Sequence, residues 1–119
     1  PACIVGHGAV VAHSVVLGES CEVGAQTTMR GPIVAGARNA FFPHCTVGTA
    51  TRHLGSSIHG RIEIGSRCVI EAHVNIFHPT GLKDGRGGVW ESRTYIGDDV
   101  YIMPYSNIGH DVVIEDGAE

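Results

Sequence analysis

The sequence predicts an all-β fold, a parallel β-helix in which the chain winds through about five coils as one domain over residues 1–119. Three observations predict it: a six-residue repeat of apolar residues, a small residue after many of them, and 17 glycines against an aromatic content of 6%. A fixed short period is typical of solenoids, in which each unit buries its apolar side against its neighbours.

The repeat runs in three blocks with the same phase inside each block. Its apolar positions are Val5, Val11, Leu17, Val23, Met29, Ala35, Phe41 and Val47, then Ile64, Ile70 and Ile76, and finally Ile96, Ile102, Ile108 and Ile114. Each hexad is expected to form one short strand whose aliphatic side chain points inward, followed by a corner at which a small residue permits close backbone approach. A period of six differs from the 3.6-residue period of a helix, and the glycine and β-branched content also opposes a helix.

Small or β-branched residues occupy the fourth place after most of these apolar positions. Three of the four cysteines, Cys21, Cys45 and Cys68, fall on this place, which predicts buried, reduced thiols rather than disulfides or zinc ligands. Three hexads close a triangular coil of about 18 residues. In the known families with this repeat the coil winds left-handedly, an exception to the usual right-handed crossover.

Two segments interrupt the phase, Thr49–Arg61 and Pro79–Thr94. They are expected to be excursions from corners, and such insertions usually gather on the binding face of a solenoid. The second contains the only tryptophan, Trp90, among several glycines. It is either a flap that packs over a neighbouring subunit or a lid over a ligand.

Charge and hydropathy exclude several classes of partner. The net charge is −4 and the basic residues form no stripe, which argues against nucleic acids and anionic membrane surfaces. No apolar run is long enough to span a bilayer, and the first residues lack the layout of a signal peptide. We therefore expect a cytoplasmic protein.

Three segments resemble the bacterial UDP-N-acetylglucosamine acyltransferases that make the first lipid A intermediate: Arg30–Gly48, Arg61–Ile70 and Ser106–Val113. The first resembles that family's Gly-Pro, Gly-x-x-Asn, aromatic-Pro and Ile-Gly succession, and the third its His-Ile-Ala-His-Asp signature. The resemblance implies a left-handed β-helix, a homotrimer and transfer of an acyl group from acyl carrier protein or coenzyme A to a sugar such as UDP-N-acetylglucosamine. It implies no resident cofactor or metal.

The resemblance also implies site residues. The general base falls on His110, with Asp111 beside it, and Asn107 stands where the family has its first signature histidine. Arg52 and His53 replace a Gln-Asp pair of the first loop, and His78 lies one place beyond a family histidine. The family continues with further coils and a helical C-terminal domain, whereas this sequence stops nine residues after His110.

The chemistry expected of such a site is compatible with these residue types. Acyl transfer from a thioester needs a base for the attacking hydroxyl or amine and donors for the oxyanion. Imidazole suits the first task because its ordinary pKa is near neutrality, and Gly109 with nearby backbone N–H groups is a candidate for the second. His78 is a candidate substrate-binding residue at the same offset as His110. His7 and His13 share that offset in the first coil, where we expect surface histidines, so the offset alone is not diagnostic.

Other readings of the same residues stay open. His110 is also compatible with an exposed histidine at a subunit seam, and His78 with a plain corner histidine. His73 and His78 are five apart, as are two zinc ligands of the γ-class carbonic anhydrases, but they sit one place off in the hexad and a third histidine is missing. An acetyl-CoA-dependent sugar acetyltransferase and a non-catalytic trimeric scaffold are the remaining alternatives.

The trimer has a physical argument of its own. Packing three triangular prisms together would bury flat faces edged with apolar residues, for which we expect Ile33, Phe42 and Val113. The C-terminal end, Glu115–Glu119, closes a hexad without a capping helix. A bare strand edge is seldom left uncovered, so we expect further residues or another molecule there.

Overall fold

The computed structural model of the chain describes residues 3–50, 60–79 and 93–119, and this part of the chain is built from short strands. The strands are β1 (Ile4–Val5), β2 (Val10–Val11), β3 (Val15–Leu17), β4 (Glu22–Val23), β5 (Thr28–Met29), β6 (Ile33–Ala35), β7 (Ala40–Phe41), β8 (Thr46–Thr49), β9 (Arg61–Ile64), β10 (Val69–Ile70), β11 (Asn75–Phe77), β12 (Arg93–Ile96), β13 (Tyr101–Ile102), β14 (Asn107–Ile108) and β15 (Val113–Ile114). No helix long and apolar enough to cross a membrane occurs in these residues.

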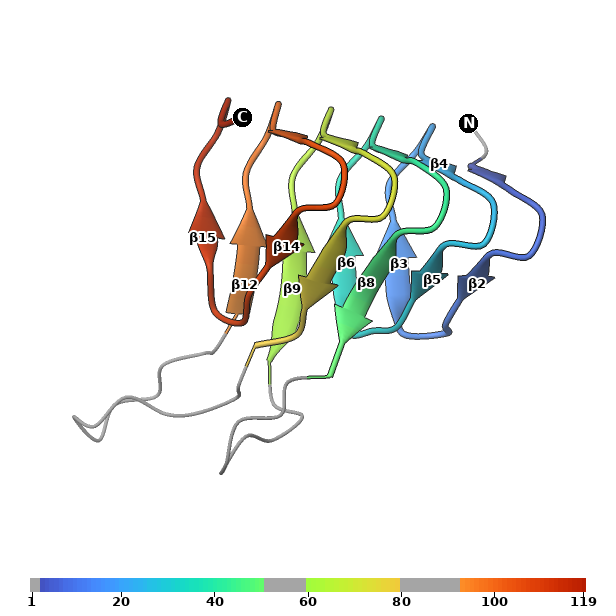
Figure 1. The fold of residues 1–119 in the computed structure, drawn as a ribbon, viewed down its shortest axis with the longest axis horizontal. Coiled ribbons are helices and arrows are strands. Elements are labelled where there is room, and N and C mark those ends of the chain that lie inside the picture. The colour runs from blue at the N-terminus through green and yellow to red at the C-terminus, as the bar shows by residue number, and fades with distance from the viewer. Residues whose placement is uncertain (1–2, 51–59, 80–92) are drawn as a thin grey trace.

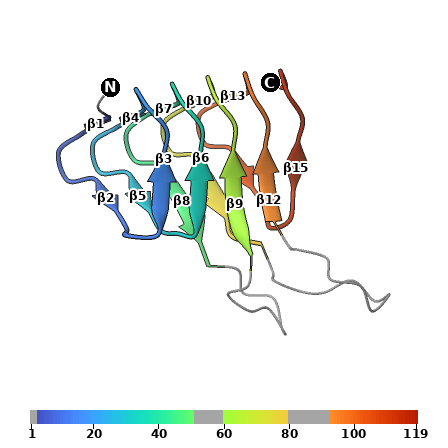
Figure 2. The same cartoon turned by 180° about the vertical axis from the view of Figure 1, so that it is seen from behind.

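The strands form three parallel five-stranded sheets, and each turn of the chain adds one strand to every sheet (Figure 1). Sheet A has the order β1-β4-β7-β10-β13, sheet B β2-β5-β8-β11-β14 and sheet C β3-β6-β9-β12-β15. Figure 2 shows the same five coils from behind, with sheet C in front and the first and last coils at opposite ends. The fold is the left-handed parallel β-helix that the repeat predicts. We number the coils 1 to 5 along the chain and name each corner by the sheets that it joins.

Each apolar position of the repeat stacks on its equivalent in the next coil. Val23 pairs with Phe41, and Phe41 with Ile70, so that one column of side chains runs along the inside of sheet A. These side chains are nearly inaccessible to solvent. Coil 1 departs from the expected burial, since Val5 is 51% and Val11 36% exposed at the end of the stack. The repeat therefore defines the core.

One residue expected on the surface lies in the core instead. Ile33 is fully buried in β6, whereas Phe42 and Val113 are 40% and 59% exposed, as predicted. Ile33 stands four places after Met29, and a tight corner turns both of these positions inward. The assignment of Ile33 to an outer face was therefore wrong, because the second small interior position of the hexad accommodates isoleucine here.

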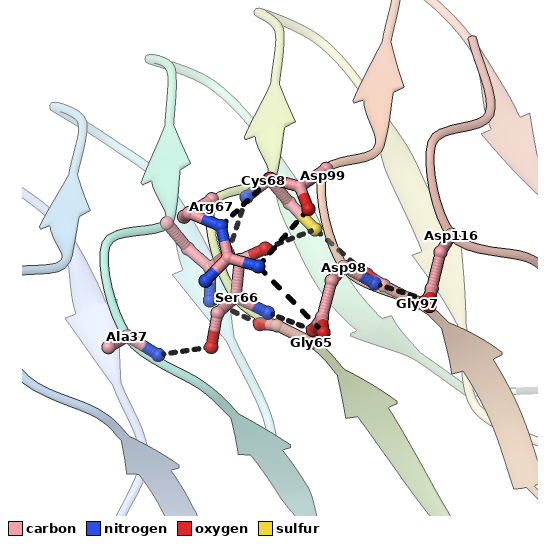
Figure 3. Close-up of polar contacts among 10 residues, drawn as sticks. Ala37, Gly65, Ser66, Arg67, Cys68, Gly97, Asp98, Asp99 and Asp116 are labelled. Atoms are coloured by element: carbon pink, nitrogen blue, oxygen red, sulfur yellow. Dashed lines mark hydrogen bonds and ion pairs between the residues drawn. The ribbon is translucent and has the colours of Figure 1, made fainter.

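A ladder of side-chain acceptors joins successive coils at the C–A corner (Figure 3). Ser66 Oγ accepts a hydrogen bond from the N–H of Ala37 at 3.0 Å, and Asp98 Oδ1 accepts one from the N–H of Ser66 at 2.8 Å. Asp116 Oδ1 accepts from the N–H of Asp98 at 2.8 Å. Each coil thus satisfies a corner N–H group of the coil before it, which the chain's own strands leave without a partner.

This ladder explains the glycines that precede it. A Cβ on Gly65 would lie 2.2 Å from Asp98 Oδ1, and one on Gly97 would lie 2.1 Å from Asp116 Oδ1. The capping side chain of the next coil occupies the space that a Cβ would need. Glycine is therefore required at this corner by close approach rather than by an unusual backbone angle.

The cysteines lie inside the corners as predicted. Cys21, Cys45 and Cys68 are at most 1% exposed and form no disulfide. Cys21 donates its S–H to the carbonyl of Gly36 at 3.2 Å, and Cys68 donates to that of Gly97 at 3.1 Å. Burial raises the pKa of all three thiols, so they act as small protonated core groups.

Asn39 takes the place of such a cysteine in coil 3 and makes more bonds than a thiol could. Its Nδ2 donates to the carbonyls of Gly36 at 3.1 Å and Gly65 at 2.8 Å, while its Oδ1 accepts from the N–H of Cys68 at 2.8 Å. The side chain is 1% exposed. It therefore ties three coils together at one buried point.

We predict that Asn39→Ala lowers the free energy of unfolding by about 3 kcal/mol, because buried backbone groups lose their partners. Asn39→Cys is the matched variant, since cysteine fills the same place in coils 2 and 4, and it should cost less than half as much. Urea denaturation followed by circular dichroism measures both. Equal losses for the two variants would contradict the role given to the hydrogen bonds.

Candidate active site

Four of the predicted site residues, His78, Gly109, His110 and Asp111, lie at the B–C corner, where both interruptions of the repeat begin. In coil 3, β8 ends at Thr49 and β9 starts at Arg61; in coil 4, β11 ends at Phe77 and β12 starts at Arg93. The two excursions are thus confirmed, although strands extend one or two residues into the predicted ranges. Figure 1 shows that sheets B and C meet at this corner along the whole stack.

His110 and Asp111 form a hydrogen-bonded pair at this corner in coil 5. His110 Nδ1 lies 2.9 Å from Asp111 Oδ2, and the side chains are 47% and 20% exposed. A carboxylate only accepts, so the proton sits on Nδ1 in the neutral imidazole and the lone pair is on Nε2. An imidazole with this tautomer, oriented by a carboxylate, has the arrangement of a general base.

The backbone of Asp111 is fixed to coil 4. It has φ 60°, and its N–H donates to Thr94 Oγ1 at 3.1 Å. Thr94 is fully buried and donates its hydroxyl proton to the carbonyl of Phe77 at 3.0 Å. Sequence reasoning missed Thr94, although one signal was present: Thr94 pairs with Ile62, so a buried hydroxyl stands where the previous coil has an aliphatic side chain.

The neighbours of the pair have defined positions. Asn107 lies in β14 on the outer face of sheet B, is exposed and pairs with Asn75 of coil 4. Gly109 follows β14, and the nearest atom that a Cβ there would meet outside its chain neighbours is Val112 Cγ2 at 3.9 Å. The N–H of Asp111 is occupied by Thr94, so oxyanion donors must come from elsewhere. Gly109 as such a donor stays a prediction.

His78 occupies the same corner in coil 4, but its ring bonds to the backbone of an earlier coil instead of to the residue that follows it. Its Nε2 donates to the carbonyl of Arg30 in coil 2 at 2.6 Å, and the ring passes over Gly48 of coil 3, where a Cβ would lie 2.9 Å from Nε2. Burial lowers the pKa of His78, against the opposing effect of the carbonyls of Arg30 and Gly31. A contact of His78 with substrate stays a prediction and would have to use Nδ1.

The other histidines lie apart from this site. His13 is at the B–C corner of coil 1 and His7 at the A–B corner of that coil, both exposed. His73 stacks between His44 and Tyr105 at the A–B corner, with ring centroids 5.1 and 4.7 Å apart. His73 and His78 therefore sit at two different corners of coil 4. The described ranges contain no group of three or more potential metal ligands.

Three residues singled out by sequence fall outside the described residues. Arg52 and His53 belong to the first interruption and Trp90 to the second. The proposed substrate contacts of Arg52 and His53 stay predictions.

Comparison with known proteins finds similarity to a transferase family over part of the chain. The family model described as bacterial transferase hexapeptide (six repeats) matches residues 93–119. Over these residues the chain is similar to bacterial transferases of the hexapeptide class, in agreement with the hexads of its five coils.

The curated relatives that it resembles are named acyl-[acyl-carrier-protein]–UDP-N-acetylglucosamine O-acyltransferase. The protein from Azorhizobium caulinodans is 28% identical over 133 residues, which cover 98% of this chain and 45% of that relative. The one from Bartonella bacilliformis is 25% identical over 126 residues, 93% of this chain and 43% of the relative. The one from Aquifex aeolicus is 33% identical over 73 residues, 60% and 25% respectively.

These relatives confirm the resemblance to hexapeptide-repeat acyltransferases that the motifs predict. The chain spans less than half the length of each relative. The activity, substrates and partners of the chain are therefore matters for proposal.

The lowered pKa of His78 predicts a pH effect on stability. The unfolded chain protonates this ring near its ordinary pKa of 6.5 before the folded chain does, so the stability that His78 contributes is present above that pH and is lost as the pH falls through the folded pKa. Between pH 7.5 and 5, the urea midpoint should fall more in wild type than in His78→Gln. His13→Gln is the control, and it should follow wild type; equal pH dependence of wild type and His78→Gln would contradict the burial effect.

Proposed function

We propose that the chain is the β-helical part of an acyltransferase that moves an acyl group from a thioester, carried by acyl carrier protein or coenzyme A, to a sugar hydroxyl or amine. The 2.9 Å contact between His110 Nδ1 and Asp111 Oδ2 carries the proposal. The curated names of the relatives support the reaction class. The acceptor we favour is a nucleotide sugar such as UDP-N-acetylglucosamine.

In the proposed reaction His110 Nε2 takes the proton of the acceptor hydroxyl or amine as its oxygen or nitrogen attacks the thioester carbonyl. The new bond forms to carbon and the carbonyl electrons move to oxygen, which nearby N–H groups stabilise. When the tetrahedral intermediate collapses, the carbon–sulfur bond breaks and the proton on Nε2 passes to the leaving thiolate. Asp111 stabilises the imidazolium between the two steps.

The quaternary part of the proposal is a cytoplasmic homotrimer with the site in a cleft between subunits. The exposed apolar side chains Phe42, Met103 and Val113, at 40, 60 and 59%, are compatible with burial between copies. A trimer would also bring a second chain's corner opposite His110, whose side chain is 47% exposed in one chain. Lipid A synthesis as the physiological setting rests on resemblance alone.

We predict that His110→Ala lowers acceptor-dependent thiol release by about 10²-fold or more, because a general base typically contributes at least that much. Asp111→Asn should lower it by about 10-fold, because asparagine also tolerates a positive φ but lacks the charge that stabilises the imidazolium. Release is measured from acetyl-CoA and acyl carrier protein thioesters with UDP-N-acetylglucosamine and a panel of sugars.

His13→Ala is the matched control, since His13 has the same offset in the repeat but lies in coil 1. It should retain wild-type release. A folded, trimeric protein that releases no thiol with any donor would favour the scaffold alternative, and dependence on acetyl-CoA alone would favour the simple sugar acetyltransferase.

A further inference from the structure

A groove of about 330 Å³ lies on the outer face of sheet B, beside the B–C corner of coils 2 and 3. Its lining residues are Thr28, Arg30, Thr46, Gly48, Thr49 and Ala50. Thr28 and Thr46 are neighbours across β5 and β8, and the hydroxyl of Thr49 donates to Asn75 Oδ1. The lining combines hydroxyl groups with one guanidinium and contains no carboxylate.

Arg30 differs from the other arginines that the structure describes. Arg38, Arg61, Arg67 and Arg93 each have a carboxylate partner within 4 Å, namely Glu19, Glu63, Asp99 and again Glu63. Within the described ranges no carboxylate pairs with Arg30. Arginine's planar set of N–H donors matches the oxygens of carboxylate and phosphate groups. A guanidinium without such a partner, at the wall of a hydroxyl-lined groove, is suited to a bound anion.

The backbone of Arg30 is held on both sides. Its N–H donates to the carbonyl of Val47 at 2.9 Å, and its own carbonyl accepts from His78 Nε2 at 2.6 Å. The His78 ring reaches this carbonyl only because Gly48 has no side chain, since a Cβ there would also lie 2.1 Å from the Arg30 carbonyl oxygen. The site from which the guanidinium extends is therefore fixed before any ligand binds, which lowers the entropic cost of binding.

We propose that this groove is an anion-binding subsite for a phosphate ester, with the Arg30 guanidinium and the hydroxyl groups of Thr28 and Thr46 as donors and His78 as a positioning residue. The inference rests on the proposed function for the identity of the ligand. Parallel strands lie about 4.8 Å apart, so Arg30 of coil 2 is roughly 14 Å from the His110 pair of coil 5 along the same corner. A single extended substrate can place its phosphate at Arg30 and its reacting group at His110.

Two substrates carry such a phosphate: the diphosphate of a nucleotide-sugar acceptor, and the phosphates of coenzyme A or of the phosphopantetheine arm. Calorimetric titration of the full chain with UDP-N-acetylglucosamine, coenzyme A and N-acetylglucosamine separates them. Arg30→Gln should weaken binding of the phosphorylated ligand by about 10-fold or more, because a charge-assisted hydrogen bond of about 1.5 kcal/mol or more is lost. The phosphorylated ligand whose affinity falls in Arg30→Gln is the one whose phosphate binds in the groove.

Arg38→Gln is the matched control, an exposed arginine at the C–A corner whose contact is with Glu19 at 3.6 Å, and it should bind as wild type does. Arg30→Lys retains the charge without the paired donors and should lie between wild type and Arg30→Gln, which keeps the test valid if the glutamine variant folds poorly. Unchanged affinity in both Arg30 variants, or no binding of either phosphorylated ligand by wild type, overturns the inference.

The outcome is separable from that of the proposed function because binding is measured without turnover. If phosphate binding depends on Arg30 but no thiol is released, only the acyltransferase proposal is contradicted. If acyl transfer depends on His110 but ligand binding is the same in the Arg30 variants, only the proposed anion-binding subsite is contradicted.

Discussion

The close approach of successive coils at the corners is the constraint on which the rest of the structure depends. Every coil makes its backbone hydrogen bonds to the coils beside it, as when the N–H of Gly36 donates to the carbonyl of Ile64 at 2.9 Å. A Cβ on Gly36 would then lie 2.2 Å from Ser66 Oγ. A corner side chain can therefore persist only where it points outward or satisfies a backbone group of the next coil, and this leaves few positions for chemistry.

The three corners accommodate the close approach of successive coils in different ways. The C–A corner holds the Ser66, Asp98 and Asp116 ladder, which stabilises the stack. The A–B corner carries left-handed residues whose rings stack outside the coil, from His44 to Tyr105. At the B–C corner the regular corner is replaced in coils 3 and 4, and Asp111 is the only non-glycine residue with a positive φ in its described part. Departures from the repeat concentrate at this corner, and so do the candidate functional groups.

The fold was predictable because the apolar residues that recur every six positions are the ones that become buried. The site was predictable only in part. The hexads placed Met29, Phe41 and Ile76 in the core, where the structure has them. The sequence could not show that Asp111 contacts His110, because adjacency along a chain does not determine side-chain direction. Nor could it show the bond from His78 to Arg30, because this bond spans two coils and depends on the missing side chain of Gly48.

The two histidines with the same offset, His13 and His110, show why position in the repeat does not by itself define a catalytic group. His13 is followed by serine, and no coil precedes coil 1 among the described residues to fix its corner. His110 is followed by Asp111, whose backbone is held by the buried hydroxyl of Thr94 from coil 4. An imidazole acts as a general base when its tautomer and orientation are determined by such partners. The same requirement separates Arg30 from the other arginines: its backbone is bonded on both sides, while its guanidinium has no carboxylate partner among the described residues.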